Sequence, residues 1–283
     1  MFLLSIIKRY SKWDRKSYRE KTIIYYRFKK VFATIVNLIP LPIGILFNLF
    51  GTDKEQNGGH HYGATYGTVL RQFRYRPIKL LEIGIGGYDS EIGGGSLLAW
   101  QAFFPFAKIV ACDIAPKPEL SSRRTRIYTI DQSSDADLAR LATAEAPFDI
   151  IIDDGSHLNE HQVFTFSKLF ASLNDSGLYI IEDVQTSFWP PGQVGKLITD
   201  GRHIDDPEFS RTCVGYFLDI AKYLNYQEFI DYRSTNEEYV QMVQNIRRIS
   251  FEHNLIVIEK GQNDAPSNNI FVRNKHARQS DRV

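Results

Sequence analysis

Apolar runs of strand length alternate with helix-like segments along most of the chain after residue 51. Five of these runs are nearly all apolar and rich in β-branched residues, which is typical of parallel strands buried on both faces of a sheet. They cover residues 78–83, 108–112, 126–130, 148–152 and 178–181. The alternation predicts an α/β, Rossmann-like fold with a mostly parallel, doubly wound sheet.

A helix is predicted between the fourth and fifth strands. Val163, Phe166, Phe170 and Leu173 recur there at helical spacing, and the Asp-Ser-Gly sequence at 175–177 predicts a stop before the fifth strand. These apolar positions are expected to belong to the core.

The pattern loosens beyond residue 187 and then predicts a closing hairpin. A helix is expected at 216–226, followed by strands at 247–251 and 255–259 that are joined by a Glu-His-Asn turn. A hairpin at this place predicts an antiparallel C-terminal edge on the otherwise parallel sheet. Residues 274–283 are polar and predict a flexible tail.

A run of twenty residues without charge, 31–50, is long enough to suggest a membrane span. Pro40 and Pro42 divide it into pieces too short to cross about 30 Å of hydrocarbon as a helix. A secretory signal does not fit, because a charged lead of thirty residues precedes the run and no small-residue cleavage site follows it.

Length and composition fit one α/β domain with an appendage. The 283 residues are 43% hydrophobic and 24% charged, and the predicted division is an N-terminal segment 1–50, a catalytic domain 51–273 and a tail 274–283. Cys112 and Cys213 are the only cysteines and neither is at metal-ligand spacing. A reducing, cytoplasmic compartment is therefore predicted.

Positive charge is concentrated at the N-terminus. Residues 1–30 hold ten Lys/Arg against Asp14 and Glu20, which gives this segment a net charge of +8. Since the whole chain has a net charge of +1, the remaining residues carry a net charge of −7. Aromatic residues are interleaved with these cations, as in helices at anionic bilayer surfaces. Three interpretations stay open: a membrane-surface segment at the inner face of the membrane, an arm that packs on a neighbouring subunit or the core, and a true span. Nucleic acid is not expected as a partner, because the basic face does not continue into the acidic remainder.

Acidic residues or glycines follow the first three strands, where ligands bind in open α/β sheets. The three strand ends carry Glu82 with Gly84 and Gly86, then Asp113, then Asp131 with Gln132. Glycines let the backbone approach a ligand, and the carboxylates could accept bonds from an amine and from ribose hydroxyls. Ser96 could cap the next helix or contact a cofactor carboxylate. A tight structural turn without a ligand is the alternative.

A nicotinamide-dinucleotide site is the competing interpretation of the glycine turn. Its third glycine would fall at Asp89, and Asp113 lies 29 positions after Gly84 instead of the usual ~20. A carboxylate at the turn would also repel a pyrophosphate. A cofactor with a cationic amino acid tail, such as S-adenosylmethionine, fits this acidic loop better.

Carboxylates and a histidine follow the fourth and fifth strands. Asp153, Asp154 and His157 follow the fourth strand, and Glu182 and Asp183 follow the fifth. Adjacent parallel strands bring these ends together, where the carboxylates repel one another unless a cation neutralises them. Mg²⁺ prefers such oxygen ligands and keeps positions open for substrate. His157 is the candidate general base, with a helix-capping or core role as the alternative.

The chain resembles the metal-dependent sugar O-methyltransferases of antibiotic biosynthesis, of the mycinamicin and tetracenomycin type. The resemblance covers about residues 51 to 190 and is carried by GTDK at 51, LLEIGIGGYD at 80, GGGSLLAW at 93, CDI at 112, DQSSD at 131, FDIIIDDGSHLNEH at 148 and IEDVQTSFWP at 181. It does not extend before residue 51, which leaves acceptor and assembly open.

The resemblance implies a class I methyltransferase fold, homo-oligomers and a specific set of site residues. It implies a metal held by Asp154, Glu182 and Asp183, His157 as general base, and cofactor contacts from Glu82, Asp113, Asp131 and Gln132. Gly84, Gly86, Ser96 and Asp153 complete the predicted cofactor-binding set.

The predicted function is methyl transfer from S-adenosylmethionine to a sugar hydroxyl, with Mg²⁺ as second cofactor. The acceptor would be a glycosylated natural product or a bacterial surface or lipid-linked glycan. A catechol-like acceptor and a non-catalytic, membrane-attached protein that binds S-adenosylmethionine are the alternatives. His60 and His61 could line the acceptor pocket or belong to a solvated loop. The Trp-Pro-Pro-Gly sequence at 189–192 could form a lid over the acceptor or a rigid structural loop.

Overall fold

The computed structural model of the chain describes residues 15–37, 39–55, 59–87, 92–195, 197–229 and 236–274. It divides into two compact units. The first comprises Met1–Ile78 and Gly84–Thr129, and the second Lys79–Ile83 and Ile130–Val283.

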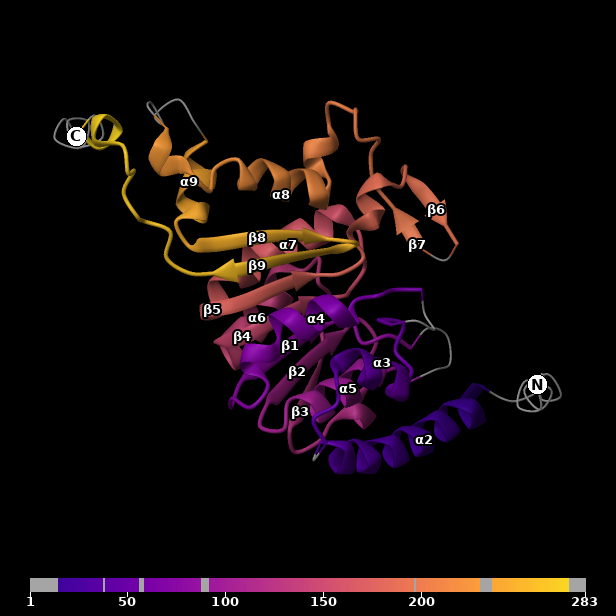
Figure 1. Cartoon of the computed structure of the whole chain (residues 1–283). Helices are drawn as coiled ribbons and strands as arrows, with labels where there is room; N and C mark the ends of the chain where they lie inside the picture. Colours follow the sequence, from indigo (N-terminus) through magenta and orange to yellow (C-terminus); the bar gives the residue numbers. More distant parts are fainter. Residues whose placement is uncertain are drawn as a thin grey trace. The chain divides into compact units, whose positions relative to one another are not determined.

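The first unit combines helices with two parallel strands (Figure 1). Its helices are α2 (Arg15–Val36), α3 (Ile43–Phe50), α4 (Gly63–Val69) and α5 (Gly95–Phe103), with short 3₁₀ turns η1 (Arg71–Phe73) and η2 (Pro118–Leu120). Strands β2 (Lys108–Asp113) and β3 (Thr125–Thr129) pair in parallel. Helix α5 is buried from Ser96 to Phe103 and contacts α2, α3 and β2.

The uncharged run at residues 31–50 does not form one continuous helix, as Pro40 and Pro42 led us to expect. Helix α2 ends at Val36, α3 begins directly after Pro42, and no helix in the described parts of the chain is long and apolar enough to span a membrane. Four side chains of α3 are at most 1% exposed, Ile43, Leu46, Phe47 and Phe50. Phe47 packs edge-on against Trp100 of α5, with ring centroids 5.1 Å apart. Helix α3 is therefore a core element of the first unit.

Five strands of the second unit pair side by side in the order β1-β4-β5-β9-β8. Strands β1 (Lys79–Ile83), β4 (Phe148–Asp153) and β5 (Leu173–Ile181) are parallel, whereas β9 (Leu255–Lys260) runs antiparallel to β5 and to β8 (Ile246–Glu252). Asn254 adopts a left-handed conformation, with φ 62°, in the turn of the β8–β9 hairpin. The predicted parallel strands and the antiparallel C-terminal edge are confirmed.

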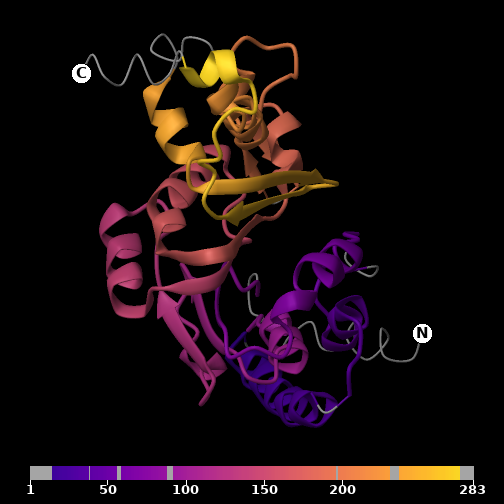
Figure 2. The same ribbon diagram turned by 60° about the vertical axis from the view of Figure 1, so that its left-hand side comes forward.

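Helices of the second unit connect and cover these strands (Figure 2). They are α6 (Asp135–Glu145), α7 (Asn159–Leu169), α8 (Cys213–Ala221) and α9 (Glu237–Val243), with 3₁₀ turns η3 (Phe170–Ser172), η4 (Val184–Phe188), η5 (Phe209–Arg211) and η6 (Tyr226–Glu228). A separate antiparallel hairpin joins β6 (Gly192–Val194) to β7 (Leu197–Thr199).

Two predicted boundaries in this unit were wrong. Leu173, assigned to a helix, begins β5, and residues 175–177 lie inside that strand as an irregularity in which Ser176 has φ 63°. The helix expected at 216–226 instead begins at Cys213, because the Thr212 hydroxyl caps it by accepting the Gly215 N–H.

The predicted domain division remains a prediction. Helices α2 and α3 belong to the same compact unit as residues 51–78, and the predicted tail falls almost wholly outside the described residues. Cys112 and Cys213 are both buried, and no disulfide joins them.

Candidate active site

The ends of β4 and β5 bring three predicted site residues together. The two strands pair in parallel with Asp153 opposite Ile181, so Asp154 and Asp183 both follow the same sheet edge. Asp154, His157 and Asp183 each offer a ligand atom, and these atoms lie within 4.8 Å of one another. Two carboxylates and an imidazole at this spacing could hold a divalent cation.

His157 is positioned by its contact with Asp183 and by its backbone. The side chain is 6% exposed, and its Nε2 lies 3.6 Å from Asp183 Oδ2. The Thr186 hydroxyl donates a hydrogen bond of 2.8 Å to the His157 carbonyl oxygen. The imidazole is thus held in place between the β4–α7 turn and the η4 turn.

Left-handed backbone occurs at both His157 and Asp183. Their φ angles are 59° and 57°, a region that costs a non-glycine residue of the order of 1–3 kcal/mol. Such conformations persist only where surrounding contacts impose them, and they are common at functional sites. The left-handed conformation at His157 and Asp183 therefore identifies the two turns that hold the group of Asp154, His157 and Asp183.

Glu182, the third predicted metal ligand, is not a member of this group. Its side chain is 1% exposed, and its backbone N–H bonds to the Asp153 carbonyl oxygen. Asp183 has a left-handed backbone, so the extended conformation of β5 does not continue through this residue. Its assignment as a ligand stays a prediction.

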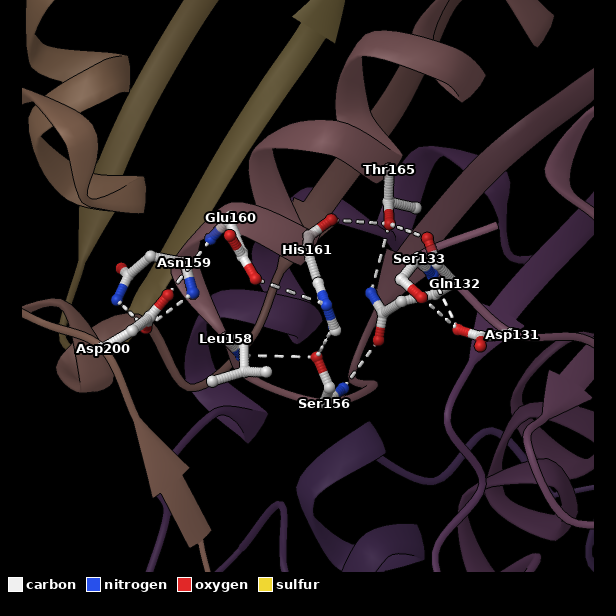
Figure 3. Close-up of polar contacts among 10 residues, drawn as sticks. All are labelled: Asp131, Gln132, Ser133, Ser156, Leu158, Asn159, Glu160, His161, Thr165 and Asp200. Atoms are coloured by element: carbon white, nitrogen blue, oxygen red, sulfur yellow. Dashed lines mark hydrogen bonds and ion pairs between the residues drawn. The ribbon is translucent and has the colours of Figure 1, made fainter. Parts of the chain in front are cut away.

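Asp153 lies fully buried beside the cluster, and Gln132 holds its carboxylate. Gln132 Nε2 donates to Asp153 Oδ1 at 3.1 Å and to the Thr165 hydroxyl at 3.2 Å, while Gln132 Oε1 accepts the Ser156 N–H at 2.7 Å. Burial raises the pKa of Asp153 to about 7, although the hydrogen bond from Gln132 acts in the opposite direction. The Gln132 amide, which was predicted to contact the cofactor, thus bonds to three parts of the second unit, and its bonds to Ser156 and Thr165 are drawn in Figure 3.

Asp131 forms a compact turn with the start of α6. Its Oδ1 accepts hydrogen bonds from the Ser133 hydroxyl at 2.7 Å and the Ser133 N–H at 2.9 Å. These bonds stabilise the charged form and lower the pKa of Asp131. Asp131 is half-buried, and both of its bonds from Ser133 go to the same oxygen, Oδ1 (Figure 3).

The glycine-rich turn of the first unit forms a tight backbone crossing. Gly84, Gly86, Gly93 and Gly94 all have left-handed φ angles, between 63° and 80°, and the Gly94 N–H bonds to the Ile85 carbonyl. A Cβ at Gly93 would overlap the backbone at Gly86. Only glycine fits this close approach.

Asp113 accepts hydrogen bonds from this turn and from a buried lysine. Its Oδ2 accepts the Ile85 N–H and lies 3.0 Å from Lys117 Nζ, while Oδ1 accepts the Ala115 N–H at 2.9 Å. Lys117 also bonds to the Gly86 carbonyl. A carboxylate has about four acceptor positions, so these three bonds leave room for one more donor.

Other predicted site residues differ in burial. Glu82 is fully buried in β1, and Ser96 is 7% exposed. The interpretation of Ser96 as a helix cap was wrong, because α5 begins at Gly95 and its N-cap is Gly94, whose left-handed backbone starts the helix earlier. His61 is exposed and lies 3.7 Å from a Glu55 oxygen.

Curated proteins with similar sequences are O-methyltransferases. No family model matches the chain. The 8-demethyl-8-alpha-L-rhamnosyl tetracenomycin-C 2'-O-methyltransferase of Streptomyces olivaceus is 42% identical over 63% of this chain and 44% of its own length. The Mycinamicin VI 2''-O-methyltransferase of Micromonospora griseorubida is 36% identical over 72% of this chain and 49% of its own length. The chain spans about half the length of these curated relatives.

A solved structure of the MycE methyltransferase in complex with Mg, SAH and mycinamycin VI superimposes with a TM-score of 0.69 at 32% identity. The match covers 82% of this chain and 58% of MycE. The chain is a homologue of sugar O-methyltransferases. Its predicted fold class, a class I methyltransferase fold with an antiparallel C-terminal edge, is confirmed.

The eight predicted cofactor residues of this methyltransferase homologue are carried by both units. Gly84, Gly86, Ser96 and Asp113 belong to the first unit, and Glu82, Asp131, Gln132 and Asp153 to the second. Their role in binding a cofactor remains a prediction.

Two polar residues near the cluster were missed by the sequence analysis. Asp200 lies 41 positions after Asn159, yet its Oδ1 accepts hydrogen bonds from the Asn159 N–H at 3.0 Å and from the Asn159 amide at 2.6 Å (Figure 3). Asn159 Oδ1 in turn accepts the Ser187 hydroxyl and the Cys213 N–H. This network fixes the start of α7 directly after His157, and no local pattern in the sequence reveals it.

Proposed function

We propose that this chain is an S-adenosylmethionine- and Mg²⁺-dependent O-methyltransferase that acts on a sugar hydroxyl. The group formed by Asp154, His157 and Asp183 carries this proposal, because its atoms lie within 4.8 Å of one another at the shared end of two parallel strands. The acceptor class is a glycosylated natural product or a surface or lipid-linked glycan, and the sugar specificity named for the relatives supports this choice.

The donor set fits a hard divalent cation. Asp154 and Asp183 would hold Mg²⁺ through carboxylate oxygens, with Glu182 as a further candidate. Bound there, the cation would lower the pKa of a coordinated hydroxyl and direct its approach. The two carboxylates also repel each other less when a cation neutralises them.

His157 would accept the proton of the acceptor hydroxyl. The contact between its Nε2 and Asp183 Oδ2 orients the ring and would stabilise the imidazolium that proton transfer creates. The methyl group of S-adenosylmethionine would pass to the acceptor oxygen. Burial of the imidazole excludes water from the site of proton transfer.

Cofactor binding is proposed for the residues predicted from the strand ends. Asp113 retains one acceptor position for a ribose hydroxyl, and the glycine turn offers a backbone surface without side chains. Asp153 and Gln132 would act less by direct contact than by holding the turn that begins at Ser156.

A methyl-transfer assay with labelled S-adenosylmethionine tests the proposal. Rhamnosides and catechols are compared as acceptors, with Mg²⁺ and with excess chelator. We expect transfer to glycosides that is abolished by the chelator, and a loss of roughly 10²–10⁴-fold in turnover for His157→Gln, the usual contribution of a general base. Asp154→Asn should lose both turnover and Mg²⁺ binding measured by calorimetry, whereas His157→Gln should keep Mg²⁺ binding.

The exposed pair His203 and Asp205 offers a matched control in the same unit. Their side chains lie 3.5 Å apart and are 78% and 86% exposed, so His203→Gln and Asp205→Asn should leave turnover unchanged. Full activity in excess chelator would refute the metal assignment. Transfer to catechols alone would favour the phenolic acceptor, and cofactor binding without any turnover would favour a non-catalytic protein.

Assembly into homo-oligomers is proposed from the family resemblance alone. Sedimentation of the full chain measures it directly. A monomer at all concentrations would contradict this part of the proposal without affecting the methyl-transfer hypothesis.

A further inference from the structure

Helix α2 attaches to the first unit through only one of its faces. Tyr26, Ala33 and Val36 on the inner face are 1–4% exposed. Two lysines add anchors, since Lys29 Nζ donates to the Phe50 carbonyl at 2.8 Å and Lys30 Nζ to the Ser121 carbonyl at 3.2 Å. These contacts fix which face of the helix points outward.

The opposite face of α2 is apolar as well. Ile24, Phe28, Val31 and Ile35 follow one another at spacings of four, three and four residues, so they form one line along the helix, the outward stripe. Their side chains are 54%, 72%, 64% and 57% exposed. A surface helix normally carries polar residues opposite its buried face, so this second apolar face is expected to contact something other than water.

Basic residues accompany the outward stripe. The sequence of α2 holds seven Lys/Arg against the single acid Glu20, and Lys21 and Arg27 are exposed. The ten Lys/Arg of residues 1–30 give this part of the chain its net charge of +8. The partner of this face should therefore combine negative charge with an apolar interior.

We propose that the outward stripe of α2 binds an anionic lipid surface, with the helix lying flat at the headgroup level. The stripe is about 17 Å long at 1.5 Å per residue, which suits a helix whose apolar side enters the headgroup boundary while flanking cations meet lipid phosphates. This binding goes beyond the proposed reaction, because methyl transfer to a soluble glycoside needs no lipid.

A second copy of the chain is a poorer partner for this face. In a twofold contact the same surface meets itself, so two strongly basic helices would be brought together. Their charges would repel at close range, whereas anionic headgroups attract them. Charge thus favours lipid over self-association.

Vesicle flotation of the full chain tests the apolar part of the proposal. Vesicles of phosphatidylcholine with added phosphatidylglycerol are compared with phosphatidylcholine alone. We expect the chain to float with the anionic vesicles only, and Phe28→Ser to weaken partitioning about tenfold. Phe106→Ser is the matched control, since Phe106 is an exposed phenylalanine of the same unit, 61% against 72%, and lies outside α2.

A second pair of variants tests the charged part. Lys21→Gln with Arg27→Gln should weaken binding to anionic vesicles about thirtyfold, at roughly 1 kcal/mol for each cation near the surface. Lys108→Gln with Arg71→Gln removes two exposed cations of the same unit elsewhere and should have no effect. Raised salt should weaken binding of the natural chain.

Several results would overturn the proposal. These are absence of flotation with anionic vesicles, equal losses in the α2 variants and their controls, and equal binding to neutral vesicles. Sedimentation of the chain without lipid tests whether the stripe instead binds a second copy. That partner would be indicated if the chain does not float with vesicles but forms a dimer, and if Phe28→Ser dissociates this dimer. Methyl transfer to a soluble glycoside, measured in parallel, reports separately on the proposed reaction.

Discussion

At the scale of single residues, Asp153 links the cluster to the stability of the chain. Its carboxyl group has a pKa of about 7 because it is fully buried, whereas in an unfolded chain its pKa is about 3.9. Between these values the folded protein keeps a proton that the unfolded chain has lost. The stability that Asp153 contributes at low pH is therefore lost as the pH rises towards 7.

The loss of stability with rising pH leads to a prediction for Asp153→Asn. The uncharged amide cannot titrate, so between about pH 5 and pH 7 the natural chain should lose about 2–3 kcal/mol of stability relative to the variant. Urea unfolding in the presence of chelator, at a series of pH values, measures the difference. Parallel stability curves for the two proteins would contradict the raised pKa.

The arrangement of His157 and Asp183 could be predicted from the sequence only in part. Their proximity followed from the order of the strands, because ends of adjacent parallel strands share an edge. Their left-handed backbone was not predictable, since histidine and aspartate rarely adopt it and only tertiary contacts impose it. The same conformation explains why Asp183 joins the cluster while its neighbour Glu182 does not.

At the scale of elements, the turn from β4 to α7 depends on Gly155. A Cβ at this position would overlap the Gln132 amide, lying 2.8 Å from its Cδ. That amide cannot move freely, because it bonds to Asp153, Ser156 and Thr165. Gly155→Ala should therefore break buried hydrogen bonds and lower the free energy of unfolding by about 1–3 kcal/mol.

Chemical denaturation measures this loss against a matched glycine. Gly67 lies inside α4, and a Cβ there would meet only Ile43 Cγ2 at 3.8 Å, so Gly67→Ala should be neutral or stabilising by up to about 1 kcal/mol. In a Gln132→Ala background Gly155→Ala should cost less, because the obstructing amide is gone. An unchanged cost in that background would show that the amide is not the cause.

The main-sheet strands of the second unit and two of its helices, α7 and α8, could be predicted from the sequence apart from their ends, while the β6–β7 hairpin and the polar network could not. Apolar runs and the closing hairpin identify β4, β5, β8 and β9 because their periodicity is local. The bonds from Asp200 to Asn159 join residues 41 positions apart, and nothing near either residue indicates the other. Long-range polar contacts of this kind become visible only once the chain has folded.

At the scale of the whole molecule, the first fifty residues are more than an appendage to the first unit. The sequence predicted a separate segment there, because charge and the two prolines set it apart. Yet α3 is apolar on nearly every side, a pattern that indicates a buried helix. The structure places Phe47 against Trp100 of α5, so one segment combines a core helix with an exposed basic one.

Truncation separates these two roles. A chain that begins at Gly51 loses four buried side chains of α3, each worth about 1.5–3 kcal/mol, and leaves Trp100 exposed. That loss is comparable with the whole stability of a typical domain, so we expect this chain to aggregate or to melt at a much lower temperature. A chain that begins at Arg15 keeps every contact described for α2 and α3 and should melt within a few degrees of the full chain. Calorimetry or thermal circular dichroism distinguishes these outcomes, and equal melting of both truncated chains would show that the folded domain begins at residue 51, as its sequence alone predicts.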